Sequence, residues 1–239
     1  MTQADEHEQP HAKEEAAAAS TPIVLAADPG GIESADTAVV ASAVADAART
    51  ADPGWHALDI SFIASGETML LGKQDMSAAW RLFLFGNGSP THHLGLLTGF
   101  PTEVDVIGLH AIGASLDGAP SDISAIVAPR CRRQVWLRNS NGERLGYATS
   151  WLHEQDVGTV FKNQKIPIGK NIMQNRTELF RDMKSVYCGT SVALERSFGH
   201  KGPFWGRSYL FWNGGRPVAF IYEVFSPALE KYMGDVLIQ

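Results

Sequence analysis

The sequence predicts an α+β fold that is built on a single antiparallel β-sheet of about six strands with helices covering it. Two observations predict this class. Stretches rich in aromatic and β-branched residues come in pairs that are joined by short turns containing Gly, as in β-hairpins. Helical patterns come before and between these pairs, and strands do not alternate with helices in repeated βαβ units.

The chain has two parts of different composition. Residues 1–54 are rich in Ala, Asp and Glu and hold ten acidic and two basic residues, whereas residues 55–239 hold 16 acidic and 18 basic residues. The net charge of −6 is therefore concentrated in the first part. Such a segment cannot bury enough apolar surface to offset its loss of conformational entropy on ordering. We predict a mostly disordered acidic tail over 1–54, with a transient Ala-rich helix at Thr37–Thr50, and a folded domain over 55–239.

The first elements of the domain are two helices and a strand. The stretch "MSAAWRLFLFG" (76–86) has its large apolar residues spaced for one helical face and ends at a Gly. The stretch "GSPTHHLGLLTG" (88–99) has a Ser N-cap, Pro90 at the first helical position and a final Gly, which predicts a second helix. The alternating stretch "TEVDVIGL" (102–109) predicts a strand.

The rest of the domain is predicted to consist of two hairpins around a helix. "RRQVWLRNSNGERLGYATSW" (132–151) reads as two strands that turn at Asn141–Gly142. "NRTELFRDMKSVYCG" (175–189) has a Glu three residues after its first Asn, as in a capping box, and a final Gly, so we expect a helix. "FWGRSYLFWNGGRPVAFIYEVF" (204–225) reads as a second hairpin that turns at 213–215.

Three charged residues lie on predicted strand faces that are otherwise apolar. Strand alternation places Arg133 beside Val and Leu, Arg207 among aromatic residues, and Glu223 beside Ile221 and Phe225. An ionised carboxylate in an apolar interior is costly unless it is paired. Two interpretations stay open. In the first, the residues have a structural role, either as an Arg–Glu pair or as arginines stacked on aromatic rings. In the second, they form a buried site in which Arg holds a ligand carboxylate and Glu accepts a hydrogen bond from a ligand hydroxyl.

Several classes of function lack their signals in this sequence. No P-loop, GxGxxG, HExxH or GxSxG pattern occurs, and the adjacent His92 and His93 would point about 100° apart on a helix, so we expect no metal site. The weakly positive body lacks the strong basic stripe of a nucleic-acid-binding protein. Two distant cysteines, no signal-peptide pattern and no apolar run of membrane-spanning length favour a cytoplasmic protein without membrane insertion, which we expect to be a monomer.

Five stretches together resemble the chorismate pyruvate-lyase family, most closely the branch found in cyanobacteria and algal plastids. In chain order they are "GSPTHHLGLLTG", "RRQVWLRNSNGERLGYATSW", "NRTELFRDM…VYCG", "GPFWGRSYLFW" and "GRPVAFIYEVFSP". The resemblance covers roughly residues 80–234 and implies a six-stranded antiparallel sheet with helical flaps over a buried ligand pocket. The same fold serves as the effector domain of some bacterial transcription regulators.

The resemblance also implies roles for particular residues. Arg133 matches the Arg that binds the ring carboxylate, and Glu223 matches the Glu that binds the 4-hydroxyl group. Arg207, in a "WGR" motif, is expected to support the site and to stabilise the departing enolpyruvyl group. Two further substrate contacts match Pro90, which cannot copy the contact of a longer side chain, and Leu179, for which Ile168 is the alternative in a second register.

One feature of the family is absent. The bacterial enzymes carry an Arg on the second strand of the first hairpin, where this chain has Thr149 and Ser150. The residue that binds the carboxylate of the substrate's side chain is therefore open, with Arg207 as a candidate.

The implied reaction converts chorismate to 4-hydroxybenzoate and pyruvate without a metal or an organic cofactor, and its product feeds quinone or other phenolic biosynthesis. The alternatives are a sensor that binds a phenolic acid or another small anion in the same pocket, and a purely structural protein in which Glu223 and Arg133 form a buried pair. Residues 1–54 are too acidic and too poor in apolar residues to form a DNA-binding winged helix, which argues against the sensor.

Overall fold

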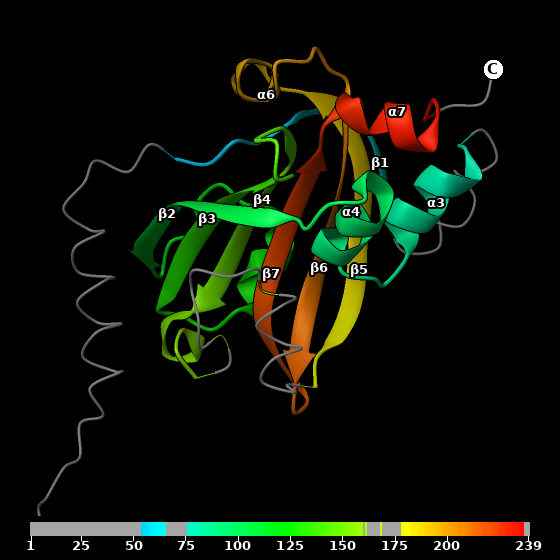
Figure 1. The fold of residues 1–239 in the computed structure, drawn as a ribbon. Helices are drawn as coiled ribbons and strands as arrows, with labels where there is room; N and C mark the ends of the chain where they lie inside the picture. Colours follow the sequence, from blue (N-terminus) through cyan, green and yellow to red (C-terminus); the bar gives the residue numbers. More distant parts are fainter. Residues whose placement is uncertain (1–53, 66–75, 160, 162–167, 169–177, 237–239) are drawn as a thin grey trace, which may run out of the picture. The chain divides into compact units, whose positions relative to one another are not determined.

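A computed structural model of the chain describes residues 54–65, 76–159, 161, 168 and 178–236. The described strands form one antiparallel sheet in the order β1-β5-β6-β7-β4-β3-β2 (Figure 1). The strands are β1 (Asp59–Ser65), β2 (Glu103–Gly113), β3 (Arg130–Arg138), β4 (Arg144–His153), β5 (Phe180–Thr190), β6 (Phe204–Asn213) and β7 (Arg216–Phe225). The helices are α3 (Ala78–Phe85), α4 (Pro90–Thr98), α6 (Val192–Phe198) and α7 (Glu230–Met233), with 3-10 turns η1 (Ser121–Ala125), η2 (Glu154–Asp156) and η3 (Pro227–Leu229). The predicted α+β class is confirmed, with seven strands rather than about six.

The two predicted hairpins are confirmed, together with their turns. Between β3 and β4, the side-chain oxygen of Asn139 accepts hydrogen bonds from the backbone N–H groups of Asn141 and Glu143, both at 3.0 Å. Gly142 completes that turn with a φ of 82°, a left-handed conformation that favours glycine. The predicted helices over 76–86 and 88–99 are present as α3 and α4, and the predicted strand over 102–109 corresponds to β2, which begins one residue later and extends to Gly113.

The helix predicted over 175–189 is wrong, because residues 180–190 form the strand β5. This strand pairs with β1 on one side and β6 on the other, and such long-range pairing outweighs the local capping signal. Gly189, expected to end a helix, instead allows close approach of β1, since a Cβ there would lie 2.3 Å from the carbonyl oxygen of Asp59. The start of the predicted helix, 175–177, lies outside the described residues.

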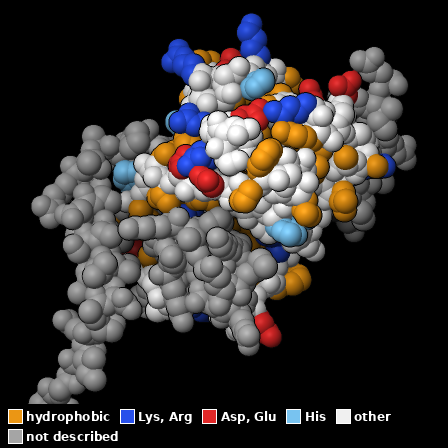
Figure 2. Space-filling view, in the orientation of Figure 1, with side chains coloured by type: hydrophobic (Ala, Val, Ile, Leu, Met, Phe, Trp, Pro, Cys, Tyr) orange, Lys and Arg blue, Asp and Glu red, His pale blue; other side chains and the backbone are white. Residues whose placement is uncertain are grey.

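Both faces of the sheet are covered, which explains why β3, β4 and β7 are buried along nearly their whole length. On one face, α3, α4 and α7 pack against strand residues in a single apolar cluster (Figure 1). On the other face, α6 and η1 pack against aromatic residues of β3, β4, β6 and β7. Hydrophobic and polar side chains are mixed on the outside of the first face (Figure 2), where Leu82 of α3 is 72% exposed and Leu96 of α4 is 70% exposed.

A short segment before β1 closes the second face by hydrogen bonds to buried tyrosines. The backbone N–H of His56 donates to the hydroxyl of Tyr147 at 3.1 Å, and that of Leu58 donates to the hydroxyl of Tyr222 at 3.2 Å. The Trp55 ring packs edge-on against Tyr222 with a centroid distance of 4.9 Å. Residues 55–58 therefore pack against the sheet. The predicted tail and its helix at Thr37–Thr50 lie outside the described residues.

We expect a chain that starts at Ala51 to melt at the same temperature as the full chain, because residues 1–50 are too poor in apolar residues to add a core. A chain that starts at Asp59 loses the partners of Tyr147 and Tyr222 and should lose about 2 kcal/mol or more. At this size, that loss lowers the melting temperature by about 4–8 °C. Thermal melts of the three chains test this. A drop of several degrees on starting at Ala51 would mean that the tail packs on the domain.

Candidate active site

A small cavity lies between the sheet and the start of α4. Its volume is about 40 Å³, whereas an apolar cavity that binds benzene has a volume of about 150 Å³. Most of its lining is apolar, with a few polar and charged side chains, which is the usual composition of a small-molecule site. It is lined by Ser89, Pro90, Thr91, Val104, Arg133, Val135, Leu137, Ala148, Ser150, Ile168, Arg181, Tyr209, Phe211, Ile221 and Glu223. A ligand with a six-membered ring requires these walls to move apart.

Glu223, in the middle of β7, is one of the charged residues in this lining and is 3% exposed. Its Oε2 atom accepts a hydrogen bond from Nε of Arg207 at 2.8 Å, and its Oε1 atom accepts one from the Tyr209 hydroxyl at 2.8 Å. A carboxylate has about four acceptor positions, and two are used among the described residues. The carboxylate is therefore paired, as its burial requires, and it retains capacity to accept a further hydrogen bond from a ligand.

Arg207 is the structural partner of that carboxylate. It lies opposite Glu223 in the register of β6 and β7, and it is fully buried. Its Nη1 atom donates to the carbonyl oxygens of Phe83 at 2.8 Å and Gly86 at 3.0 Å, and its Nη2 atom donates to that of Gly88 at 3.3 Å. All three guanidinium nitrogens thus bind protein groups, and Arg207 is not among the residues that line the cavity. It ties the end of α3 and the loop before α4 to the sheet.

Arg133 places a second guanidinium on the cavity wall. It lies on β3 opposite Ser150 of β4, and it is 2% exposed. Burial lowers its pKa to about 10, and the nearby Cys131 partly opposes this. The side chain therefore remains charged at neutral pH, in an environment where its charge is costly. An anionic ligand in the cavity would offset that cost.

Tyr209 is a site residue that the sequence did not single out. Burial raises its pKa, and the charge of Glu223 raises it further, so the phenol stays protonated at neutral pH and donates to that carboxylate. The signal was present in the sequence, because Tyr209 shares a strand face with Arg207. Sequence alternation alone indicates only an aromatic residue beside an arginine and does not show that its hydroxyl meets Glu223.

Arg181 is the other functional candidate that was missed, because its segment was predicted to be helical. It lies on β5 and lines the cavity. Its guanidinium carbon is 4.4 Å from the centroid of the Tyr209 ring and 5.1 Å from that of Phe211. Its Nη1 atom donates to the carbonyl oxygen of Asn87 at 2.6 Å and to that of Gly88.

Of the other residues predicted to contact the substrate, some line the cavity and one does not. Pro90 lines the cavity, and so does Ile168. Leu179 and Ile168 both pack against the buried cluster that includes Phe211, but Leu179 does not line the cavity. Of the two alternatives for this substrate contact, Ile168 is therefore the one in the cavity lining.

Within the described ranges, no group of three or more His, Cys, Asp or Glu side chains is arranged to hold a metal ion. Over the same ranges, each helix falls short of the length and apolar character needed to cross a bilayer.

Comparison with known proteins gives a family match over most of the domain. A family model described as "Chorismate pyruvate-lyase Rv2949c-like" matches residues 84–233. The chain is 32% identical over 153 residues to the uncharacterized protein ycf21 of Porphyra purpurea, covering 64% of this chain and 83% of that protein. It is also 32% identical over 151 residues to the uncharacterized protein ycf21 of Cyanophora paradoxa, covering 63% of this chain and 78% of that protein.

Similarity to solved structures is weak. The effector domain of PhnF from Mycobacterium smegmatis superimposes with a TM-score of 0.47 at 12% identity, covering 61% of this chain and 92% of that domain. The possible transcriptional regulator YydK from Bacillus subtilis gives a TM-score of 0.44 at 13% identity, covering 59% of this chain and 62% of that chain.

Proposed function

This chain belongs to the Rv2949c-like chorismate pyruvate-lyase family, as its sequence motifs predict, and we propose that it converts chorismate to 4-hydroxybenzoate and pyruvate. The observation that carries the proposal is the presence of a buried cation, Arg133, and a buried carboxylate, Glu223, in the lining of one cavity. A ring that bears a carboxylate at one end and a hydroxyl at the other would use both groups.

The register of the sheet supports this assignment. Glu223 lies opposite Ala148 of β4, and Ala148 lies opposite Val135 of β3, two residues from Arg133. With strands about 4.8 Å apart and a rise of about 3.4 Å per residue, the two backbone positions are roughly 12 Å apart on one face. Both side chains line the same cavity from this separation, so a ring that enters between them, once the walls move apart, would meet Arg133 at one end and Glu223 at the other.

The proposed chemistry needs orientation more than a strong acid or base. The reaction breaks the bond between ring carbon 3 and the ether oxygen, removes the hydrogen on carbon 4 and adds a proton to the enolpyruvyl methylene carbon, which gives pyruvate. The ring becomes aromatic, which supplies the driving force. Arg133 holds the ring carboxylate, and Glu223 holds the 4-hydroxyl group. Arg207 and Tyr209 fix the Glu223 carboxylate, so Arg207 acts as a positioning residue in this proposal.

We expect the purified protein to release pyruvate and 4-hydroxybenzoate from chorismate in equal amounts. A lactate dehydrogenase coupled assay measures pyruvate, and chromatography measures the aromatic product. Turnover should be the same with and without EDTA, because the proposed mechanism uses no metal ion.

The same preparation tested with isochorismate provides the control for substrate identity. Turnover of isochorismate in place of chorismate, or loss of activity with EDTA, would contradict the assignment. Tight binding of 4-hydroxybenzoate without any turnover of chorismate would instead favour a sensor that binds a phenolic acid.

A further inference from the structure

We propose that Arg181 binds the second carboxylate of the substrate, on the enolpyruvyl side chain, and thereby makes the site prefer the dicarboxylate substrate to its monocarboxylate product. This inference rests on the proposed function. Two cationic residues, Arg133 and Arg181, occur among the described residues that line the cavity. Chorismate carries two carboxylates and 4-hydroxybenzoate carries one. Arg133 serves the ring carboxylate that both molecules share, which leaves the second carboxylate for Arg181.

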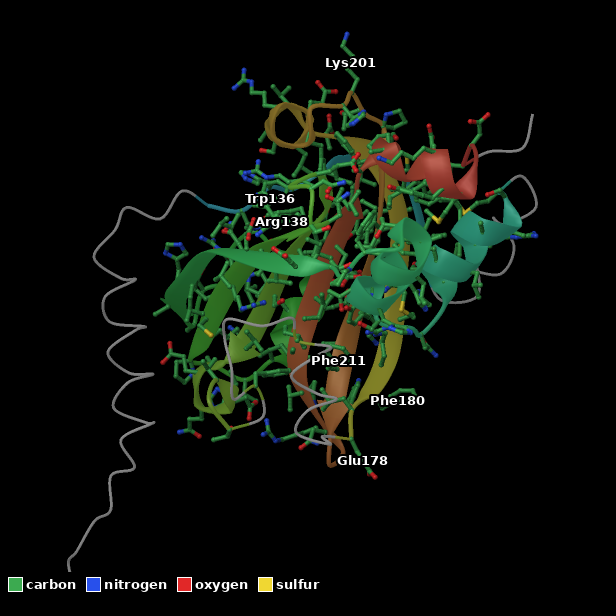
Figure 3. All side chains as sticks on the ribbon, viewed as in Figure 1. Trp136, Arg138, Glu178, Phe180, Lys201 and Phe211 are labelled. Atoms are coloured by element: carbon green, nitrogen blue, oxygen red, sulfur yellow. The ribbon has the colours of Figure 1, made fainter. Side chains whose placement is uncertain are left out.

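The position of the Arg181 guanidinium is fixed by stacking on two rings. Arg181 lies opposite Phe211 in the register of β5 and β6. Figure 3 shows where Phe211 lies on the sheet, well apart from Trp136 on β3. The guanidinium carbon is 4.4 Å from the Tyr209 ring centroid and 5.1 Å from that of Phe211. A guanidinium held over aromatic faces keeps its donors at its edges, where a planar anion can meet them.

One edge of this guanidinium is available to a ligand. The hydrogen bonds that Arg181 makes to described residues, the carbonyl oxygens of Asn87 and Gly88, both come from Nη1. Its Nε atom is buried and has no hydrogen-bond partner among those residues. An Arg side chain has five N–H donors. The edge formed by Nε and Nη2 is the one that holds a carboxylate through two parallel hydrogen bonds.

Arg207, the candidate from sequence, is less suited to this role. Its Nε atom donates to Glu223, and its two terminal nitrogens donate to carbonyl oxygens of the α3–α4 region. It is fully buried and does not line the cavity. To bind a substrate carboxylate it would have to give up the contacts that hold Glu223 in place. Arg181 needs no such exchange.

This role has a distinctive experimental signature, because the carboxylate that Arg181 binds leaves with pyruvate. Loss of Arg181 should weaken the binding of chorismate and spare that of 4-hydroxybenzoate. Arg181 also holds the backbone of Asn87 and Gly88, next to the cavity wall at Ser89–Thr91. A purely structural role in that contact would weaken the binding of both ligands together. The ratio of the two affinities therefore separates the two roles.

The test uses the full chain with Arg181→Met and Arg181→Lys. Arg181→Met should raise the KM for chorismate about tenfold or more, which is the effect of losing hydrogen bonds to a charged group. It should leave the Kd for 4-hydroxybenzoate, measured by titration, within about twofold. Arg181→Lys keeps the charge but not the planar fork, so its KM should lie between those of the wild type and Arg181→Met. It also keeps the test decisive if the Met variant does not fold.

Arg144→Met is a matched control. Arg144 also stacks on a ring, at 4.6 Å from the Trp136 centroid, and donates to one carbonyl oxygen, that of Ser197, but it lies outside the cavity lining. It should change neither constant. If the wild type turns over chorismate and both Arg181 variants keep its affinity ratio, the role of Arg181 is wrong and the lyase assignment stands. If the wild type binds chorismate without turnover, the lyase assignment fails, and the Kd values of the variants still decide the role of Arg181. If it binds neither ligand, both are wrong.

Discussion

Replacing Arg207 with Met should lower the free energy of unfolding by about 3–5 kcal/mol, because it leaves the Glu223 carboxylate buried without its cation. The same change removes the hydrogen bonds that tie the carbonyl oxygens of Phe83 and Gly86 to the sheet. For a domain of this size, the melting temperature should fall by about 6–20 °C. Thermal and urea melts measure the effect. An unchanged melting temperature would mean that the pair contributes little to folding.

The companion variant Glu223→Gln separates the structural role of the pair from a role in binding. The amide is nearly isosteric and keeps an oxygen that can accept from Nε of Arg207, so the fold should be retained. The affinity for 4-hydroxybenzoate should fall about tenfold or more, because a neutral amide is a weaker acceptor for the phenol than a carboxylate. A large loss of melting temperature with unchanged ligand affinity would show that Glu223 serves only as the structural partner of Arg207.

A double variant, Arg207→Met with Glu223→Leu, completes this comparison. Apolar replacements for both members of a buried ion pair are often neutral or stabilising. We expect the double variant to recover most of the melting temperature that Arg207→Met loses, but not to bind 4-hydroxybenzoate, because the Glu223 carboxylate is absent. Recovered stability together with lost binding would support a carboxylate that acts on the ligand.

The parts of the fold that the sequence predicted are those specified by local signals. The β3–β4 and β6–β7 hairpins follow from strand alternation and from Asn–Gly turns, and the helix start at Pro90 follows from its N-cap and N1 residues. Alternation also predicted that Arg133, Arg207 and Glu223 occupy core-facing positions of a single sheet. The strand register places them on the same face, where Arg133 and Glu223 line the cavity.

The errors arise where pairing over long sequence distances decides the structure. Residues 180–190 carry a helix-like start and end, yet they form β5 because β1 and β6 flank them. Because of that error, Arg181 was not predicted to be a site residue, since a residue on a helix would not lie on the same face of the sheet as Tyr209. The alternation of side chains along a strand also could not show whether one face of the sheet is buried or both are. Arg132 and Arg133, adjacent on β3, point to opposite faces, yet both are buried.

The adjacent arginines offer a sharp test of the site. Arg133→Met should keep the melting temperature within a few degrees, because burial already disfavours the charge of this side chain and lowers its pKa to about 10. The same variant should lose the anchor for the ring carboxylate. Truncation of one member of a buried, hydrogen-bonded charge pair costs about 2–5 kcal/mol of binding, so the affinity for 4-hydroxybenzoate should fall about 30-fold to several thousandfold.

Arg132→Met is the matched control for this prediction. Arg132 lies on the opposite face of β3 and forms an ion pair with Asp117 at 2.6 Å, whose other carboxylate oxygen accepts a hydrogen bond from the Trp151 indole. Its loss leaves Asp117 without that cation, so stability should fall while ligand affinity persists. Arg133→Met should show the reverse pattern, with binding lost and stability kept. Melts and 4-hydroxybenzoate titrations of both variants decide the matter: if Arg133→Met binds the ligand as tightly as the wild type, the ring carboxylate has another partner and the proposed orientation of the substrate is wrong.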